Sequence, residues 1–178
     1  MIQEVYQKAM KFAGEAHKDQ KVPGTNANYL LHISNVAMEV LMAYQAEPNF
    51  DLELAIQIAI LHDSIEDTVL TTDDLAAEFG EDVAIGVQVL TKDATLESKS
   101  VKMKDSLDRI RNCPFEESAI VKLADRITNL QEPPANWSLE KRKNYLMEAE
   151  MINAELADTN HFLNNRLAAK IKEYSQWI

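Results

Sequence analysis

The sequence predicts an all-α fold in a single domain, and three observations support this. Apolar residues recur at three- and four-residue steps almost throughout, which is the spacing of one face of a helix. The chain holds only four glycines and five prolines, too few turn residues for a β-protein of this size. Its 178 residues fit one domain of ordinary length. We therefore expect residues 1–178 to form one bundle of about eight to ten helices.

The first part of the chain is expected to hold three helices. The first covers residues 3–18, because apolar side chains recur there on one face. A loop follows at 19–28, broken by Pro23 and Gly24, and the second helix starts directly after it. The third helix, 52–62, is apolar on nearly every side, so we expect it in the centre of the core.

The second part begins with a short helix. Thr72 or Asp73 is expected to cap this helix, which covers 75–79 and ends at Gly80. A polar loop is expected over 92–100. The remaining helices are expected at 81–90, 101–112, 115–130, 138–157 and 159–177.

The composition is strongly acidic, with 29 Asp and Glu against 18 Lys and Arg and a formal net charge of −11. Such a field repels nucleic-acid backbones and anionic lipid, so neither a nucleic-acid polymer nor a membrane is an expected partner. A small phosphorylated ligand stays compatible, because a bound cation reverses the local charge of a pocket. The single Cys113 excludes an internal disulfide and a cysteine-built metal site. With no secretory leader or membrane-length apolar run, a cytoplasmic protein is expected, and homo-oligomer formation is left open.

A histidine and three carboxylates follow the most apolar predicted helix. His62, Asp63, Glu66 and Asp67 lie within six residues, with no cation among them. Buried carboxylates so close together are costly unless a metal ion or a proton compensates, and residues three and four apart share a helix face. The run therefore predicts a metal site with proton-handling carboxylates at the next turn. The alternative is an exposed helix end whose acids are solvated.

Two further ligands are predicted from other helices. His32 begins the second helix, and Asp125 interrupts a largely apolar run. Alone, the first would be a core histidine and the second the partner of a neighbouring arginine. With His62 and Asp63 they provide two imidazoles and two carboxylates, a set that suits Mn²⁺, with Fe²⁺ or Zn²⁺ as alternatives. Asn129 lies four residues beyond Asp125, so its amide shares that helical face.

The other histidines and the cysteine offer less chemistry. His17 falls at a helix C-terminus, where it either supports the following loop or lines the pocket. His161 starts the last helix and is expected to be exposed. No glycine-rich phosphate loop or Gly-x-Ser-x-Gly elbow occurs, and Cys113 lies in a turn before Pro114. Nucleophilic serine or cysteine catalysis is therefore not expected.

Four motifs follow one another in an order that resembles a known family. They are Ala16-His17-x-x-Gln20, Tyr29-x-x-His32, Leu61-His62-Asp63-x-x-Glu66-Asp67-Thr68 and Val121-Lys122-Leu123-Ala124-Asp125-Arg126-x-x-Asn129-Leu130. The series resembles HD-domain phosphohydrolases, and more closely the hydrolase domain of Rel/Spo-type alarmone enzymes and the stand-alone small alarmone hydrolases. The segment from Asn136 to Tyr145 also looks like the stand-alone group. The similarity covers residues 5–155.

The resemblance implies an all-helical HD fold with one Mn²⁺ that removes the 3′-pyrophosphate from guanosine tetra- or pentaphosphate, (p)ppGpp. It assigns four residues to the metal: His32, His62, Asp63 and Asp125. It assigns Glu66 and Asp67 to the activation and orientation of water, and it places substrate at Lys21, Tyr29 and Asn129. Elementary chemistry agrees, because a divalent ion lowers the pKa of water and a nearby carboxylate can accept the proton.

One departure from the family's pattern concerns the loop at 19–28. The family has an Arg-Lys pair there that contacts the base and the phosphates, whereas Lys21 is the only cation in this loop. We therefore expect Lys21→Ala to raise KM with little change in kcat, and guanine and adenine substrates to be poorly discriminated. Two alternatives stay open. One is an HD hydrolase for another phosphorylated nucleotide, such as an adenine alarmone, a nucleotide monophosphate or a phosphorylated dinucleotide. The other is a non-catalytic alarmone sensor, against which the intact Glu66–Asp67 pair argues.

Overall fold

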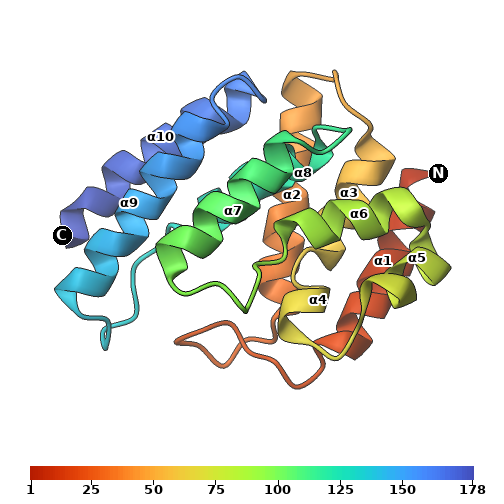
Figure 1. Cartoon of the computed structure of the whole chain (residues 1–178), viewed down its shortest axis with the longest axis horizontal. Coiled ribbons are helices and arrows are strands. Elements are labelled where there is room, and N and C mark those ends of the chain that lie inside the picture. The colour runs from red at the N-terminus through yellow and green to blue at the C-terminus, as the bar shows by residue number, and fades with distance from the viewer.

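The computed structural model describes residues 1–178 and holds ten α-helices and a closing 3₁₀ turn (Figure 1). The helices are α1 (Ile2–Ala16), α2 (Leu30–Ala46), α3 (Leu52–Leu61), α4 (Ser64–Asp67), α5 (Thr72–Phe79), α6 (Glu81–Leu90), α7 (Lys99–Arg111), α8 (Glu117–Asn129), α9 (Leu139–Glu155) and α10 (His161–Tyr174). No strand is present; one isolated β-bridge joins Lys21 to Asn28 between α1 and α2. The all-α prediction and the expected number of helices are confirmed.

Helix α3 lies at the centre of the core, as its apolar sequence predicts. Residues Ile58 to Leu61 are fully buried, and the helix packs against α1, α2, α6 and α8. Its buried side chains belong to a core of 34 hydrophobic residues that reaches from Ala9 to Tyr174. Because α3 has almost no polar side chains to desolvate, surrounding it on all sides is favourable.

A glycine sets the distance between α3 and α6. A Cβ atom on Gly86 would lie 2.3 Å from Cδ1 of Ile58, which is far inside van der Waals contact. Glycine therefore permits close packing of two helices, and this outweighs its cost within a helix. Gly86 is a packing requirement of the core.

The order of the helices in space separates the two ends of the molecule (Figure 1). Helices α9 and α10 lie side by side at one end and pack on α8, whereas α1 and α5 lie at the other end. Helix α7 contacts α6, α8 and α9, so the loop before α7 lies between the two ends. None of the ten helices combines the length and the apolar character needed to cross a membrane.

Helix α5 starts three residues before the predicted bound of 75, at Thr72, and its cap lies one residue before the nearer predicted cap. Thr71 is the N-cap: its hydroxyl accepts from the Asp74 amide at 3.2 Å, and its own amide donates to the Asp74 carboxylate at 2.9 Å. This reciprocal pair is a capping box, which neither Thr72 nor Asp73 forms, so the expectation that one of them caps the helix is wrong. Gly80 ends α5 as predicted, with a positive φ of 93° that favours glycine.

The chain turns directly after α3. Helix α3 ends at Leu61, and His62 and Asp63 form the turn that leads into the short helix α4. The Thr68 hydroxyl donates to the Ser64 carbonyl at 2.5 Å and closes that single turn. A continuous helix would place Glu66 and Asp67 on the face of His62 and Asp63, but the turn redirects α4.

Candidate active site

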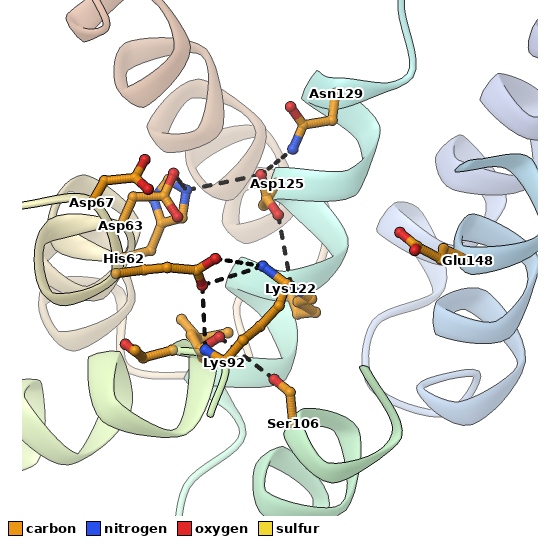
Figure 2. Close-up of polar contacts among 12 residues, drawn as sticks. His62, Asp63, Asp67, Lys92, Ser106, Lys122, Asp125, Asn129 and Glu148 are labelled. Atoms are coloured by element: carbon orange, nitrogen blue, oxygen red, sulfur yellow. Dashed lines mark hydrogen bonds and ion pairs between the residues drawn. The ribbon is translucent and has the colours of Figure 1, made fainter. Parts of the chain in front are cut away.

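Four side chains from three segments meet beside α8, and Figure 2 shows three of them: His62, Asp63 and Asp125. His32 comes from the first turn of α2, His62 and Asp63 from the turn after α3, and Asp125 from α8. His62 Nε2 lies 2.9 Å from Asp63 Oδ2, and His32 Nε2 lies 3.4 Å from Asp125 Oδ1. The two Nε2 atoms are 3.3 Å apart. The structure thus brings together all four residues that the sequence singles out as ligands.

The orientation of His62 leaves one ring nitrogen facing this cluster. Its Nδ1 lies 2.7 Å from the carbonyl oxygen of Ala59, and since a carbonyl only accepts, Nδ1 carries the hydrogen. Nε2 then points toward His32 and the carboxylates. A backbone carbonyl that holds one imidazole nitrogen while the other is free is a common arrangement for a metal-ligating histidine.

Three of the four residues form a compact set of donors. One ligand atom from each of His32, His62 and Asp63 lies within 4.8 Å of the others, so these residues could hold a metal ion. Asp125 joins them through the imidazoles, with Oδ1 at 3.8 Å from His62 Nε2. The Tyr29 hydroxyl donates to Asp63 and the Asn129 amide donates to Asp125. These two neutral donors orient the carboxylates.

The charges in the cluster stabilise one another. Burial raises the pKa of Asp63, but the charge and hydrogen bond of His62 outweigh it, and this pKa lies well below its usual range. Burial likewise raises the pKa of Asp125, but its hydrogen bond with His32 outweighs this effect, so this pKa also lies well below its usual range. Burial lowers the pKa of His62, whereas Asp63 and Asp125 raise it to about 9. Without a metal ion, the two buried carboxylates therefore retain a proton on an imidazole.

Glu66 and Asp67 are more exposed than the ligands and have different partners. Glu66 accepts from the Lys92 ammonium at 2.8 Å. Asp67 accepts from Gln20 Nε2 at 2.8 Å, and Gln20 Oε1 lies 2.6 Å from His17 Nδ1. Burial raises the pKa of Asp67, and the hydrogen bond from Gln20 opposes this. The acids are thus paired within the site, in contrast to the solvated acids of a free helix end.

His17 supports the loop and does not line the pocket. Its side chain is buried, its ring lies 5.2 Å from that of Tyr29, and it reaches Asp67 only through Gln20. Of the two roles that the sequence leaves open for His17, the structure supports the first.

An open cavity of about 1100 Å³ lies over the cluster. Its carboxylate wall comprises Tyr29, Asp63, Glu66, Asp67, Asp125 and Asn129. We call its six cations the cationic wall: Lys92, Lys99, Lys102, Lys122, Arg126 and Lys141. The lining also includes Glu97, Glu140 and Glu148, and three of the cations pair with lining acids: Lys92 with Glu66, Lys122 with Asp125 and Arg126 with Glu148. His32 and His62 are buried and do not line the cavity. The donor set therefore lies at the base of a space large enough for a nucleotide.

The cationic wall was not predicted from the sequence. It holds six of the 18 Lys and Arg of an acidic chain, so a third of the cations of the chain line this cavity together with its acids. Arg126 lies 4.6 Å from the centre of the Tyr145 ring, and its Nε and Nη1 atoms are buried without a hydrogen-bond partner. Lys141 lies 3.9 Å from the centre of the Trp137 ring. Lys122 and Arg126 lie in the motif around Asp125, and Lys141 lies in the segment from Asn136 to Tyr145, whereas the other three lysines carried no local signal.

Other predicted positions differ in their relation to the cavity. Tyr29 and Asn129 line it, whereas Lys21 does not; Lys21 is exposed in the loop between α1 and α2. His161 is exposed at the start of α10, as expected. Cys113 is a free, partly buried thiol outside the cavity.

This fold and these motifs match a family model described as the HD domain, over residues 9–160. The chain belongs to the HD domain family. The resemblance inferred from the four motifs is therefore confirmed, and all four motifs fall within the matched residues.

Named relatives cover most of the chain. A Danio rerio protein named guanosine-3′,5′-bis(diphosphate) 3′-pyrophosphohydrolase MESH1 is 31% identical over 163 residues, which cover 89% of this chain and 87% of the relative. An Aquifex aeolicus protein named guanosine-3′,5′-bis(diphosphate) 3′-pyrophosphohydrolase is 35% identical over 157 residues. These residues cover 86% of this chain but 21% of that longer protein. A solved structure of a metazoan SpoT ortholog, described as hydrolysing ppGpp, has a TM-score of 0.81 at 25% identity and covers 95% of this chain and 94% of its own.

Proposed function

We propose that this HD domain protein is a Mn²⁺-dependent (p)ppGpp 3′-pyrophosphohydrolase. The observation that carries the proposal is the position of the donor set at the base of a cavity whose other wall holds six cations. A phosphohydrolase needs both features, because one activates water and the other binds phosphate. The relatives named as 3′-pyrophosphohydrolases support the substrate.

The donor chemistry supports Mn²⁺ as the ion. Two imidazoles and two carboxylates suit a divalent ion between hard and soft, and Fe²⁺ and Zn²⁺ are the alternatives. We infer that His32, His62, Asp63 and Asp125 would hold it. When bound, such an ion supplies positive charge that lowers the pKa of water and neutralises phosphate charge.

The remaining residues of the carboxylate wall handle water and substrate. Glu66 accepts the proton of the attacking water, and Asp67, held by Gln20, orients that water. Tyr29 and Asn129 line the cavity while they hold Asp63 and Asp125, so they position the ligands and face the nucleotide at once.

The cationic wall binds the phosphate groups of the substrate. Lysine ammonium groups act as point charges toward phosphate, and the planar Arg126 guanidinium offers paired donors. Lys122 is buried, and burial lowers its pKa, so a phosphate would gain a poorly hydrated partner. This wall explains how a protein with a net charge of −11 accepts a highly anionic nucleotide.

We further propose that residues 1–178 act as one catalytic unit in the cytoplasm. The core that surrounds α3 also includes residues of α10, so the site depends on packing from both ends of the chain.

A second candidate is hydrolysis of another phosphorylated nucleotide, such as an adenine alarmone or a phosphorylated dinucleotide. The observation that favours it is the loop between α1 and α2, whose only cation, Lys21, does not line the cavity. This loop therefore offers no charged group to read a guanine.

A substrate panel separates these candidates. The Mn²⁺-loaded protein is incubated with ppGpp, its adenine counterpart, nucleotide monophosphates and a phosphorylated dinucleotide, and the release of pyrophosphate and orthophosphate is followed. Pyrophosphate from ppGpp supports the proposal. Pyrophosphate from the adenine counterpart alone, or orthophosphate from the monophosphates or the dinucleotide, supports the second candidate. Tight binding of ppGpp without turnover would contradict both and indicate a sensor. Asp63→Asn is the control for contaminating hydrolases.

A further inference from the structure

Glu66 is held by one residue through two different donors. The Lys92 ammonium lies 2.8 Å from Oε1 and 3.2 Å from Oε2 of Glu66, and the Lys92 backbone amide donates to Oε2 at 3.2 Å. Lys92 follows the end of α6 and lies across from the turn that carries His62 and Asp63 (Figure 2). The carboxylate predicted to accept a proton is therefore already paired with a cation.

The backbone donor is fixed in place by Arg109 on α7. Arg109 Nη2 donates to the Thr91 carbonyl at 2.8 Å, and this carbonyl belongs to the same peptide unit as the Lys92 amide. Arg109 Nη1 also donates to the carbonyls of Gln88 and Val89 at 2.9 and 3.0 Å. The peptide between Thr91 and Lys92 thus has a cation on its oxygen and a carboxylate on its hydrogen, which polarises both hydrogen bonds in the same sense.

The side-chain donor is different, because it can move. The Lys92 side chain is 36% exposed, lines the cavity and ends on a flexible four-carbon stem. Burial lowers the pKa of Lys92, but the charge of Glu66 and, more weakly, those of Asp125 and Asp63 raise it above its usual value. The ammonium is therefore charged and close to the cluster where we place the phosphate under attack.

We propose that Lys92 exchanges partners when substrate binds: its ammonium leaves Glu66 for a phosphate group of the substrate, while its backbone amide keeps Glu66 in place. This inference rests on the proposed function, because it concerns the same cavity. A phosphate group has more charge and more acceptor oxygens than one carboxylate, so it competes well for an ammonium. Once the ammonium leaves, the Glu66 oxygens that it occupied are free to accept a hydrogen bond from water.

The exchange would couple the availability of the Glu66 carboxylate to the presence of substrate. In the free protein the Lys92–Glu66 pair neutralises both charges, which limits repulsion near Asp63 and Asp125. With substrate bound, the cation is on the phosphate and the base is released. Arg109 acts as a positioning residue, because it contacts the peptide that holds Glu66 and does not line the cavity.

A binding cycle with inorganic pyrophosphate tests the exchange without any hydrolysis. Isothermal titration compares the wild type, Lys92→Met, Glu66→Gln and the double variant, each loaded with one equivalent of Mn²⁺. Lys92→Met is expected to weaken pyrophosphate binding about tenfold, because a charge-assisted hydrogen bond is lost. Glu66→Gln is expected to tighten pyrophosphate binding about fivefold, since the carboxylate that competes with the phosphate for Lys92 is removed. In the Lys92→Met background, the same Glu66→Gln substitution is expected to change binding less than about twofold.

Matched variants separate this effect from a loss of structure. Lys92→Arg keeps the cation and should bind within about threefold of the wild type. Lys104→Met makes the same change at an exposed lysine of α7 outside the cavity and should have no effect. Thermal unfolding of each variant verifies that it is folded.

The cycle has clear contrary outcomes. If Glu66→Gln tightens binding equally with Lys92 and with Met at that position, the gain is a general charge effect and the exchange is wrong. If Lys92→Met binds pyrophosphate as tightly as the wild type, Lys92 is only a structural partner of Glu66. A coupled cycle in a protein that does not hydrolyse ppGpp would retain the exchange and overturn the proposed function instead.

Discussion

The two walls of the cavity are built from different kinds of segment. The carboxylate wall lies next to buried helices, and its aspartates Asp63, Asp125 and Asp67 are held by neutral donors from Tyr29, Asn129 and Gln20, respectively. The cationic wall combines the buried Lys122 and Arg126 of α8 with more exposed lysines from the loop after α6, from α7 and from α9. The first wall is preorganised, whereas much of the second consists of side chains that can still move.

This difference separates the effects expected from substitutions. Rigid, buried donors control the chemical step and the stability of the metal-loaded protein. Flexible cations contribute the same attraction to bound substrate and transition state, so their loss should raise KM more than it lowers kcat. The predictions below test this division, beginning with the largest effect.

Asp63→Asn should abolish turnover of the proposed substrate and remove the stabilisation by Mn²⁺. The substitution removes a ligand charge and leaves His62 without its carboxylate partner, so the metal-loaded state loses binding energy that is also folding energy. Activity and the Tm are measured with Mn²⁺ and with a chelator. The metal assignment would be contradicted if chelation left the activity and the Tm of the wild type unchanged.

Glu66→Gln should lower kcat by about 10²–10⁴ in a single-turnover assay while substrate binding is retained, and tightened about fivefold if the Lys92 ammonium is released to the phosphate. The amide retains the size of the side chain but cannot accept the proton. Asp67→Asn should lower kcat as well, by a smaller factor. A Glu66→Gln enzyme within a few-fold of the wild type would assign the base to another residue.

Metal binding should depend steeply on pH because of His62. In the metal-free protein burial lowers the pKa of His62, but Asp63 and Asp125 raise it to about 9, above the unfolded value of about 6.5. The positive charge of protonated His62 therefore stabilises the metal-free fold fully below pH about 6.5, and this stabilisation is lost as the pH rises to about 9. Since Mn²⁺ must replace the proton, its apparent affinity should rise about tenfold per pH unit in this range.

Titration with Mn²⁺ at several pH values measures this slope. The exposed His161 provides the control, because His161→Gln should leave the slope unchanged. An affinity that does not vary between pH 6.5 and 9 would show that His62 is not protonated in the metal-free protein.

Lys141→Gln should raise KM about three- to tenfold and change kcat less than about twofold. Lys141 lines the cavity over the Trp137 ring, where it contributes attraction to phosphate but no proton transfer. Lys143→Gln is the matched control, since Lys143 is on the same helix but outside the cavity. A large fall in kcat would remove the functional distinction between the two walls.

Lys21→Ala should have the smallest effect, a change in KM of less than about twofold. The sequence favours Lys21 as a phosphate-binding residue, but the structure places it outside the cavity lining. The ratio of KM values for the guanine and adenine substrates is measured alongside. A rise in KM as large as that of Lys141→Gln would show that the loop between α1 and α2 folds over the substrate.

The sequence by itself determined the helices and the ligand cluster. Apolar periodicity is a local property, so α1, α3 and α6 begin and end within two residues of their predicted bounds. The ligands were also visible, because His62 and Asp63 follow an apolar helix and Asp125 interrupts another. A polar group in such a setting is costly unless it has a partner, which makes it stand out in the sequence.

Only the tertiary structure decided where the flexible cations lie. Nothing local distinguishes Lys92 from Lys21, since both are single lysines in polar loops. Packing of α6 against α3 and α7 brings Lys92 to Glu66, whereas Lys21 stays exposed. An exposed lysine costs little folding free energy at any surface position, so the residues around it in the sequence do not indicate its neighbours in space. Long-range packing alone decides whether such a lysine faces the cavity.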